Sequence, residues 1–239
     1  MPYYSLRLDT RLGGLRLDVT IALNAPWTVI FGPSGSGKST ILRAACGLLP
    51  KADLASAFFT LSGERDQLDG PISISPHLRR IGYAPQGAVL FPHLSVKDNI
   101  AFAADARQAR AASTQTIADA INLFDLGALA DRMPHNLSGG ERQRVNLARA
   151  FAVPEARLLL LDEPFTGVDR ALRDALLPRM QQRIAQLGVP VLSVTHDVEE
   201  ALLLGAEVIR LEQGSVIDQG PAPRVLAEER ARMLNILQL

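Results

Sequence analysis

The chain has 239 residues, and its 25 Lys and Arg residues balance 25 Asp and Glu residues, so the formal net charge is zero. With 47% apolar and 21% charged residues, the composition is that of a globular protein and excludes a disordered chain. The neutral charge also excludes a strongly basic nucleic-acid-binding protein, although it leaves a local basic patch open.

The N-terminal part of the chain is expected to form β-strands. Apolar and polar residues alternate over residues 4–8 and again over residues 15–21, as in half-buried strands. The glycine pair at 13–14 predicts a hairpin turn between them. A short apolar strand at 28–31 then leads into a glycine-rich stretch and a helix through Leu48.

From residue 157 onward, short apolar stretches alternate with helical patterns. The expected strands are 158–161, 191–194 and 208–211, and the expected helices are 171–187 and 198–204. This alternation indicates a parallel sheet that helices cover on both faces. Between the two halves, residues 51–84 predict further short strands with loops, and residues 95–152 are mostly helical.

These patterns predict an α/β fold with a parallel sheet, an N-terminal antiparallel β region and an inserted helical subdomain. The α/β core is expected to comprise residues 1–86 and 155–220. The helical subdomain is expected over residues 87–154. Residues 221–239 would form a C-terminal tail that ends in a short amphipathic stretch.

A glycine-rich loop lies between the expected strand at 28–31 and the helix that follows it. The loop consists of Gly32, Pro33, Ser34, Gly35, Ser36, Gly37, Lys38, Ser39 and Thr40. It matches the phosphate-binding pattern G-x-x-x-x-G-K-[ST], whose glycines let backbone N–H groups converge on phosphate oxygens. Lys38 is suited to the β- and γ-phosphates, and the Ser39 hydroxyl is suited to Mg²⁺. The loop therefore predicts a nucleoside triphosphate site.

The strand at 158–161 ends in two carboxylates, Asp162 and Glu163. Parallel sheets bind ligands at the carboxyl ends of their strands, so both residues are expected near the phosphates. Because neighbouring strand residues point to opposite sides, the two carboxylates need not share a role. One could hold Mg²⁺ and the other could position or deprotonate the attacking water.

Residues 137–144, Leu-Ser-Gly-Gly-Glu-Arg-Gln-Arg, predict the start of a helix. Ser138 and Glu141 have the spacing of a capping box. Gly139 and Gly140 leave the first N–H groups of this helix uncovered, which suits an anion. A plain well-capped helix explains the same residues.

Together these segments resemble the ATP-binding subunits of ABC transporters over residues 15–219. Residues 137–141 look like the family's signature motif, which is highly specific between a phosphate loop and an Asp-Glu strand end. Gln86 resembles the glutamine of the lid loop, and Asp169 lies in a segment similar to the loop at the dimer interface. His196 resembles the switch histidine.

The resemblance implies a P-loop nucleoside triphosphatase core and a head-to-tail homodimer that sandwiches ATP. Each ATP would lie between the phosphate loop of one subunit and Ser138, Gly139 and Gly140 of the other, with Asp169 also at the nucleotide. The enzyme would be an ATPase whose hydrolysis is coupled to transport.

The same resemblance implies roles for the catalytic residues. Glu163 would be the general base, and His196 would contact the γ-phosphate. Asp162 and Ser39 would serve Mg²⁺. Gln86 would sense the metal or the water and couple the site to a membrane partner.

The implied partners are an integral-membrane permease subunit and, indirectly, a periplasmic or surface solute-binding protein. We expect no nucleic-acid partner. The single cysteine, Cys46, indicates a reducing compartment. No apolar run approaches the roughly 18 residues that span a bilayer, and residues 1–11 lack the pattern of a secretory signal. The expected location is therefore cytoplasmic, peripheral on the inner face of the cell membrane.

Within the family, three segments look most similar to molybdate importer ATPases: residues 79–83, 90–96 and 176–178. Many of those proteins carry a further C-terminal domain of small strands, which this sequence lacks. It would then be a short form, or it would move another solute. Molybdate or tungstate therefore stays open against sulfate, phosphate, polyamine or another solute.

One departure from the family concerns the adenine base. Transporter ATPases usually offer an aromatic residue upstream of the phosphate loop, but none lies between Asp9 and Ile21. The base would instead rest on an aliphatic residue such as Leu12, or under Arg11. Weaker selectivity for adenine is the expected consequence.

Two other functions fit parts of the sequence. A soluble ABC-type ATPase that acts on DNA or the ribosome is the main alternative. Such proteins usually have two ATPase halves or a long inserted coiled coil, and this chain has neither. A regulatory nucleotide switch without transport is the third possibility.

Overall fold

A computed structural model describes residues 4–49, 54–61, 76–105 and 110–237 of the chain. The chain divides into two compact units. Unit 1 comprises Met1–Pro76 and Leu192–Leu239, and unit 2 comprises His77–Val191. The domain limits expected from the sequence stay a prediction.

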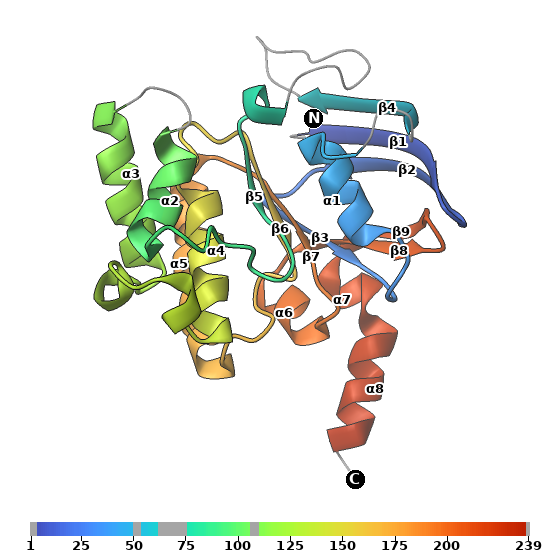
Figure 1. The fold of residues 1–239 in the computed structure, drawn as a ribbon. Helices are drawn as coiled ribbons and strands as arrows, with labels where there is room; N and C mark the ends of the chain where they lie inside the picture. Colours follow the sequence, from blue (N-terminus) through green and yellow to red (C-terminus); the bar gives the residue numbers. More distant parts are fainter. Residues whose placement is uncertain (1–3, 50–53, 62–75, 106–109, 238–239) are drawn as a thin grey trace. The chain divides into compact units, whose positions relative to one another are not determined.

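Unit 1 is built on a sheet with the strand order β4-β1-β2-β9-β8-β3-β7. Its strands are β1 (Tyr4–Leu12), β2 (Leu15–Leu23), β3 (Trp27–Phe31), β4 (Leu54–Leu61), β7 (Val191–Val194), β8 (Glu207–Glu212) and β9 (Ser215–Pro221). β1 and β2 pair antiparallel with Leu12 opposite Leu15, so the glycine pair forms the expected hairpin turn. β3 and β8 pair parallel (Figure 1). The predicted α/β class with an antiparallel N-terminal region is confirmed.

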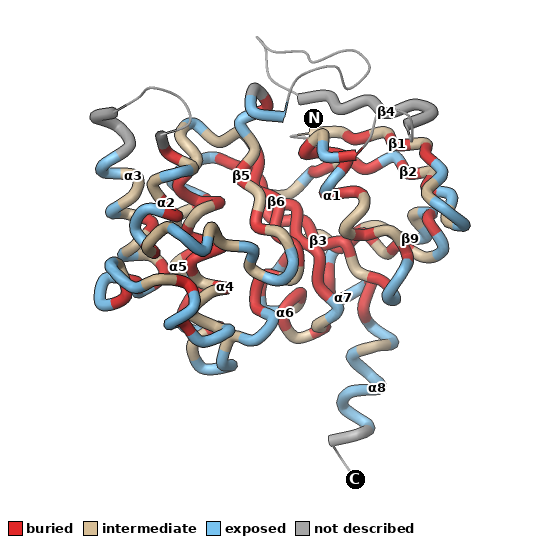
Figure 2. Tube along the Cα trace, viewed as in Figure 1, coloured by how far each residue is buried: buried red, intermediate tan, exposed pale blue. Residues whose placement is uncertain are grey.

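The core of unit 1 follows from the alternation seen in the sequence. The buried positions of β1 and β2 are Leu6, Leu8, Thr10, Leu17, Val19, Ile21 and Leu23. Their neighbours along each strand are half-buried or exposed, so one face of the hairpin packs inward. Figure 2 shows the same pattern along the strands. α1 (Lys38–Cys46) buries Ile41 and Leu42 and ends at Gly47, whose φ of 73° stops the helix before Leu48.

The C-terminal part of unit 1 contains three short helices. They are α6 (Val198–Leu203), α7 (Ala222–Val225) and α8 (Ala227–Leu237). α7 is anchored by the buried side chains of Ala222 and Val225. Residues 230–235 of α8 are all exposed, as Figure 2 shows. The tail is therefore helical over most of its length.

Unit 2 combines a pair of strands with helices. β5 (Ile81–Ala84) and β6 (Leu158–Asp162) pair parallel. The helices are α2 (Val96–Asp105), α3 (Arg110–Leu123), α4 (Gly139–Phe151) and α5 (Arg170–Leu187), with short 3-10 turns η2 (Pro76–Leu78), η3 (Gly127–Leu129) and η4 (Pro134–Asn136). Phe124 packs edge-on against Phe151 at 5.3 Å in the core. The expectation of a mostly helical segment over 95–152 agrees with α2, α3 and α4 in its described residues, whereas residues 106–109 lie outside the described part of the chain.

Candidate functional site

The glycine-rich loop of unit 1 curls tightly between β3 and α1. Gly35 and Gly37 adopt φ angles of 79° and 102°, which are readily available only to glycine. A Cβ on Gly32 would lie 2.1 Å from the Leu211 carbonyl oxygen. Lys38 Nζ donates to the carbonyl oxygens of Gly32 and Pro33, at 2.8 Å each. Lys38 therefore ties the loop to its own backbone, and the absence of a side chain at Gly32 lets the loop lie close to β8.

The amino end of α1 is left uncapped by side chains. Gly37 occupies the N-cap position, and no side chain hydrogen-bonds there. The hydroxyl of Ser36 is buried and finds no hydrogen-bond partner among the described residues. Ser34 is exposed, whereas Ser39 and Thr40 are half-buried in the first turn. Uncovered N–H groups, the helix dipole and buried hydroxyl donors together suit a phosphate group.

His196, the other site residue in unit 1, follows β7. It is exposed, between buried Thr195 and the half-buried Asp197 that begins α6. The Thr195 N–H donates to the Ile30 carbonyl of β3 at 3.4 Å. The histidine is thus carried by a turn that is joined to the strand leading into the phosphate loop.

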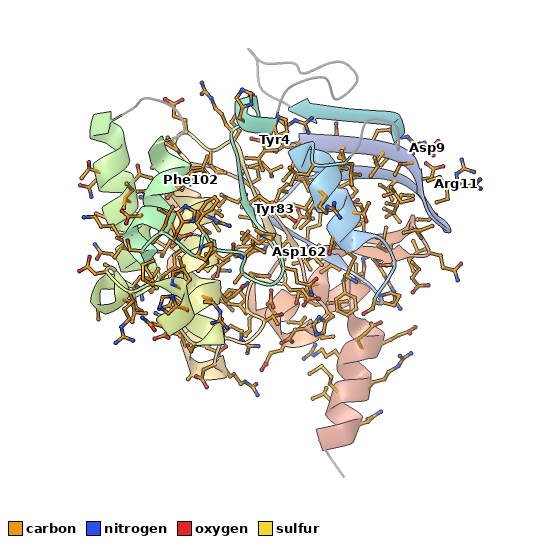
Figure 3. The ribbon with its side chains drawn as sticks, in the orientation of Figure 1. Tyr4, Asp9, Arg11, Tyr83, Phe102 and Asp162 are labelled. Carbon is orange, nitrogen blue, oxygen red and sulfur yellow. The ribbon has the colours of Figure 1, made fainter. Side chains whose placement is uncertain are left out.

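In unit 2, β6 delivers the two predicted carboxylates. Residues 158–161 are buried, and Asp162 is 2% exposed at the end of the strand, where Figure 3 labels it. Glu163 has a φ of 49°, an uncommon conformation for a residue with a side chain. Its Oε2 atom accepts hydrogen bonds from Gln86 Nε2 and Thr166 Oγ1, both at 3.1 Å. Two donors therefore orient this carboxylate.

Gln143 also belongs to this site, although the sequence analysis did not single it out. Its Nε2 atom donates to the carbonyl oxygens of Glu163 and Pro164, at 3.2 and 3.0 Å. Gln143 is buried on α4. The available signal was its spacing, because positions 143, 147 and 150 share one helix face and the other two are apolar.

The start of α4 has the predicted capping box. The Glu141 N–H donates to Ser138 Oγ at 3.2 Å, and the Ser138 N–H donates to Glu141 Oε2 at 2.7 Å. The hydrogen bonds from the backbone and then the side chain of Ser138 lower the pKa of Glu141. A Cβ on Gly140 would lie 2.8 Å from the Gly167 carbonyl oxygen, whereas one on Gly139 would meet nothing within 4 Å. One glycine permits close packing, and the other leaves the helix end open.

Asp169 has a local structural role in the structure. Its Oδ1 atom accepts hydrogen bonds from the N–H groups of Ala171 and Leu172, at 2.9 and 3.2 Å. The carboxylate thereby caps the amino end of α5. This contact fixes the segment that also carries Gly167.

The loop after Gln86 and helix α2 present an aromatic patch, made of Val89 and Phe91 from the loop and Phe102 from the helix. Phe91 and Phe102 have ring centroids 4.4 Å apart, and Arg149 lies over the Phe91 ring at 5.6 Å. Burial lowers the pKa of Arg149, which also donates to the Val89 carbonyl at 2.8 Å. Val89 is 66% exposed and Phe102 54% exposed, and Figure 3 shows Phe102 on α2. Unit 2 therefore holds large apolar side chains at its surface.

Asn99 fixes the loop beneath this patch. Its side chain accepts from the Phe91 N–H at 2.8 Å and donates to the Leu94 carbonyl at 2.9 Å. Asn146 donates to the Pro85 carbonyl at 2.8 Å, immediately before Gln86. The segment that carries the glutamine is thus held at both ends.

The structure groups the predicted residues within each unit. In unit 1 the phosphate loop carries Lys38, and the turn after β7 carries His196. In unit 2, Gln86 contacts Glu163, and the start of α4 packs on the segment that contains Gly167. No helix among the described residues combines the length and apolarity needed to cross a bilayer.

Comparison with known proteins identifies the family. A family model described as ABC transporter matches residues 17–166. The chain belongs to this family. It is 41% identical over 219 residues to the molybdenum import ATP-binding protein ModC of Rhodopseudomonas palustris, covering 88% of this chain and 55% of the relative. The chain thus spans little more than half the length of such ModC relatives.

A second relative of this ABC transporter chain matches it over most of its own length. The molybdate/tungstate import ATP-binding protein WtpC of Archaeoglobus fulgidus is 34% identical, with 98% of this chain and 94% of the relative covered. Among solved structures, an ATP-binding subunit of an ABC transporter matches with a TM-score of 0.79 at 24% identity, covering 95% and 92% of the two chains. The structure of a dimeric ATP-binding cassette bound to ADP and phosphate matches with a TM-score of 0.76 at 25% identity. The match covers 92% of this chain and 98% of that chain. The sequence resemblance is confirmed.

Proposed function

We propose that this chain is the ATP-hydrolysing subunit of an ABC-type importer, with molybdate or tungstate as the transported solute. The observation that carries the ATPase proposal is the Glu163 carboxylate, oriented by Gln86 and Thr166. The phosphate loop supplies the matching site for a triphosphate. The names of the ModC and WtpC relatives support the choice of solute.

Hydrolysis would proceed by attack of water on the γ-phosphate, releasing ADP and inorganic phosphate. Glu163 accepts a proton from the attacking water, and the two donors on its Oε2 atom restrict the orientation of the carboxylate. Lys38 and the backbone N–H groups of the loop stabilise charge on the phosphates. His196 contacts the γ-phosphate. The protein contributes positioning and electrostatics rather than a covalent intermediate.

The side chains that we assign to Mg²⁺ have the chemistry that this ion prefers. Mg²⁺ prefers hard oxygen ligands. The assigned ligands are of this kind: the Ser39 hydroxyl, the Asp162 carboxylate and the amide oxygen of Gln86. Among the described residues, no three His, Cys, Asp or Glu side chains gather as a metal site. Mg²⁺ commonly uses one or two protein oxygens together with substrate phosphates and water. When bound, it would neutralise phosphate charge.

We also propose a head-to-tail homodimer. The amino end of α4 is open at Gly139, where added atoms would meet nothing within 4 Å. Uncovered N–H groups at this end suit a γ-phosphate that the partner subunit's loop binds. The nucleotide site of one subunit would then be completed by four residues of the other: Ser138, Gly139, Gly140 and Asp169.

The aromatic patch supports a membrane partner. Exposed Val89 lies in the segment that follows Gln86, and exposed Phe102 lies on α2. A protein bound to both would sense movements of that glutamine. We assign the patch to an integral-membrane permease, with a solute-binding protein acting indirectly on the far side. The chain would then be cytoplasmic and peripheral on the inner face of the membrane.

Co-purification tests this assignment. The tagged chain is isolated from detergent-solubilised native membranes, and its partners are identified by mass spectrometry. The proposal predicts a multi-span membrane protein, lost when Phe102 is changed to Asp but kept with the exposed-site control Leu203→Asp. Recovery of only ribosomal or DNA-associated proteins would contradict it. Uptake of molybdate by cells that have and lack the chain, with sulfate as the comparison anion, tests the solute.

A further inference from the structure

We propose that Glu200 is a positioning residue that holds His196 in place through the hydroxyl of Thr195. This inference rests on the proposed ATPase function. Glu200 is 4% exposed and Thr195 is 2% exposed, so both are withdrawn from water. Thr195 Oγ1 donates a hydrogen bond to Glu200 Oε2 at 3.0 Å. His196 follows Thr195 directly in the chain.

The hydrogen bonds around Glu200 form a closed circuit across the turn that carries His196. The Asp197 N–H donates to Thr195 Oγ1 at 3.1 Å. The Asp197 carboxylate in turn accepts from the Glu200 N–H at 3.2 Å. These bonds therefore hold Thr195 and Asp197, the residues on both sides of the histidine. Figure 1 shows the short connection from β7 into α6 that this circuit encloses.

The chemistry of a carboxylate explains why Glu200 suits this place. The Thr195 hydroxyl donates its hydrogen bond to the Oε2 acceptor atom of Glu200. This orientation leaves a lone pair of Thr195 Oγ1 directed at the Asp197 N–H. The buried carboxyl group of Glu200 thus stiffens the turn through its hydrogen bond.

The circuit matters for catalysis because His196 must meet a phosphate at one place. A misplacement of about 1 Å in a catalytic group lowers rates by about 100-fold. The Thr195 N–H also bonds to Ile30 on β3, which leads into the phosphate loop. Glu200 therefore sets the histidine relative to the loop without touching the nucleotide.

The test compares steady-state ATP hydrolysis by the full-length chain and its variants. Glu200→Ala should lower kcat by about 10-fold to 100-fold with a much smaller change in KM. Glu200→Gln keeps an acceptor oxygen and should recover most of kcat. Glu199→Ala, on the same helix, is the matched control and should leave kcat unchanged. Equal losses in the alanine and glutamine variants would overturn the proposal.

A double-mutant cycle with His196→Ala separates positioning from general damage. If Glu200 acts through the histidine, Glu200→Ala should cause no further loss of kcat in the His196→Ala background. Additive losses would overturn the inference while leaving the ATPase assignment intact. A wild-type chain without ATP hydrolysis would overturn the proposed function itself. If Glu200→Ala does not fold, Thr195→Val replaces it in the cycle, and Thr195→Ser is its rescue.

Discussion

The side-chain amide of Gln86 donates a hydrogen bond to Glu163 Oε2 at 3.1 Å, joining the segment after β5 to the end of β6. Thr166 donates to the same oxygen, so the carboxylate has two fixed donors on one atom. Gln86 also begins the segment that leads to the aromatic patch. A single contact therefore links the proposed general base to the surface assigned to a membrane partner.

Removal of this contact should slow hydrolysis without abolishing it. A hydrogen bond to a charged group contributes about 1.5 kcal/mol, which corresponds to about a tenfold change in rate. Gln86→Ala should therefore lower kcat by about that factor. The exposed Gln182→Ala on α5 is the control. Turnover of Gln86→Ala at the wild-type rate would contradict the assigned role.

The hydrogen bonds of Gln143 should contribute to the stability of the fold. Replacement by alanine leaves the carbonyl oxygens of Glu163 and Pro164 without the donors they have in the structure. A buried polar group left unpaired costs about 1–3 kcal/mol. Urea unfolding of Gln143→Ala should show a loss of that size, compared with little change for Gln182→Ala. Equal stability of the two variants would show that water replaces the amide.

Alanine substitutions at Gly139 and Gly140, at the start of α4, should differ sharply in their effect on stability. A Cβ at position 140 would crowd the Gly167 carbonyl at 2.8 Å, whereas position 139 is open. Overpacking of this kind costs about 1–3 kcal/mol. Thermal unfolding should show Gly140→Ala to be clearly less stable than Gly139→Ala. The reverse order would mean that this segment packs differently.

Base selectivity should be weak. The β1–β2 hairpin offers half-buried Leu12 and Leu15 and exposed Arg11, with no aromatic ring between Asp9 and Ile21. We therefore expect ATP to be preferred over GTP by less than about 100-fold, or about 2.7 kcal/mol. Competition between the two nucleotides for binding measures the ratio. A larger preference would mean that another residue reads the base.

Local sequence patterns predicted several features well. The hairpin at Gly13 and Gly14, the phosphate loop and the Ser138–Glu141 capping box each depend on residues close together in the chain. Short-range backbone chemistry decides such features, so periodicity and turn residues reveal them. The family resemblance then related these separate segments to one nucleotide site.

Contacts between distant segments could not be predicted in the same way. Gln143 reaches the carbonyl oxygens of Glu163 and Pro164, and Arg149 covers the ring of Phe91. Sequence alone does not specify which distant groups meet, because tertiary packing decides it. The end of α1 also differs from the expected one at Leu48. Gly47 adopts a left-handed conformation and stops the helix before the apolar pattern ends.

Glu163→Gln tests the central claim most directly. The amide keeps the size of the side chain but removes the base that accepts a proton from water. Hydrolysis should fall by at least about 100-fold, while ATP binding persists, as measured by equilibrium binding under the same conditions. The matched control is Glu155→Gln, which alters an exposed carboxylate paired with Arg80. If Glu163→Gln hydrolyses ATP near the wild-type rate, Glu163 is not the general base.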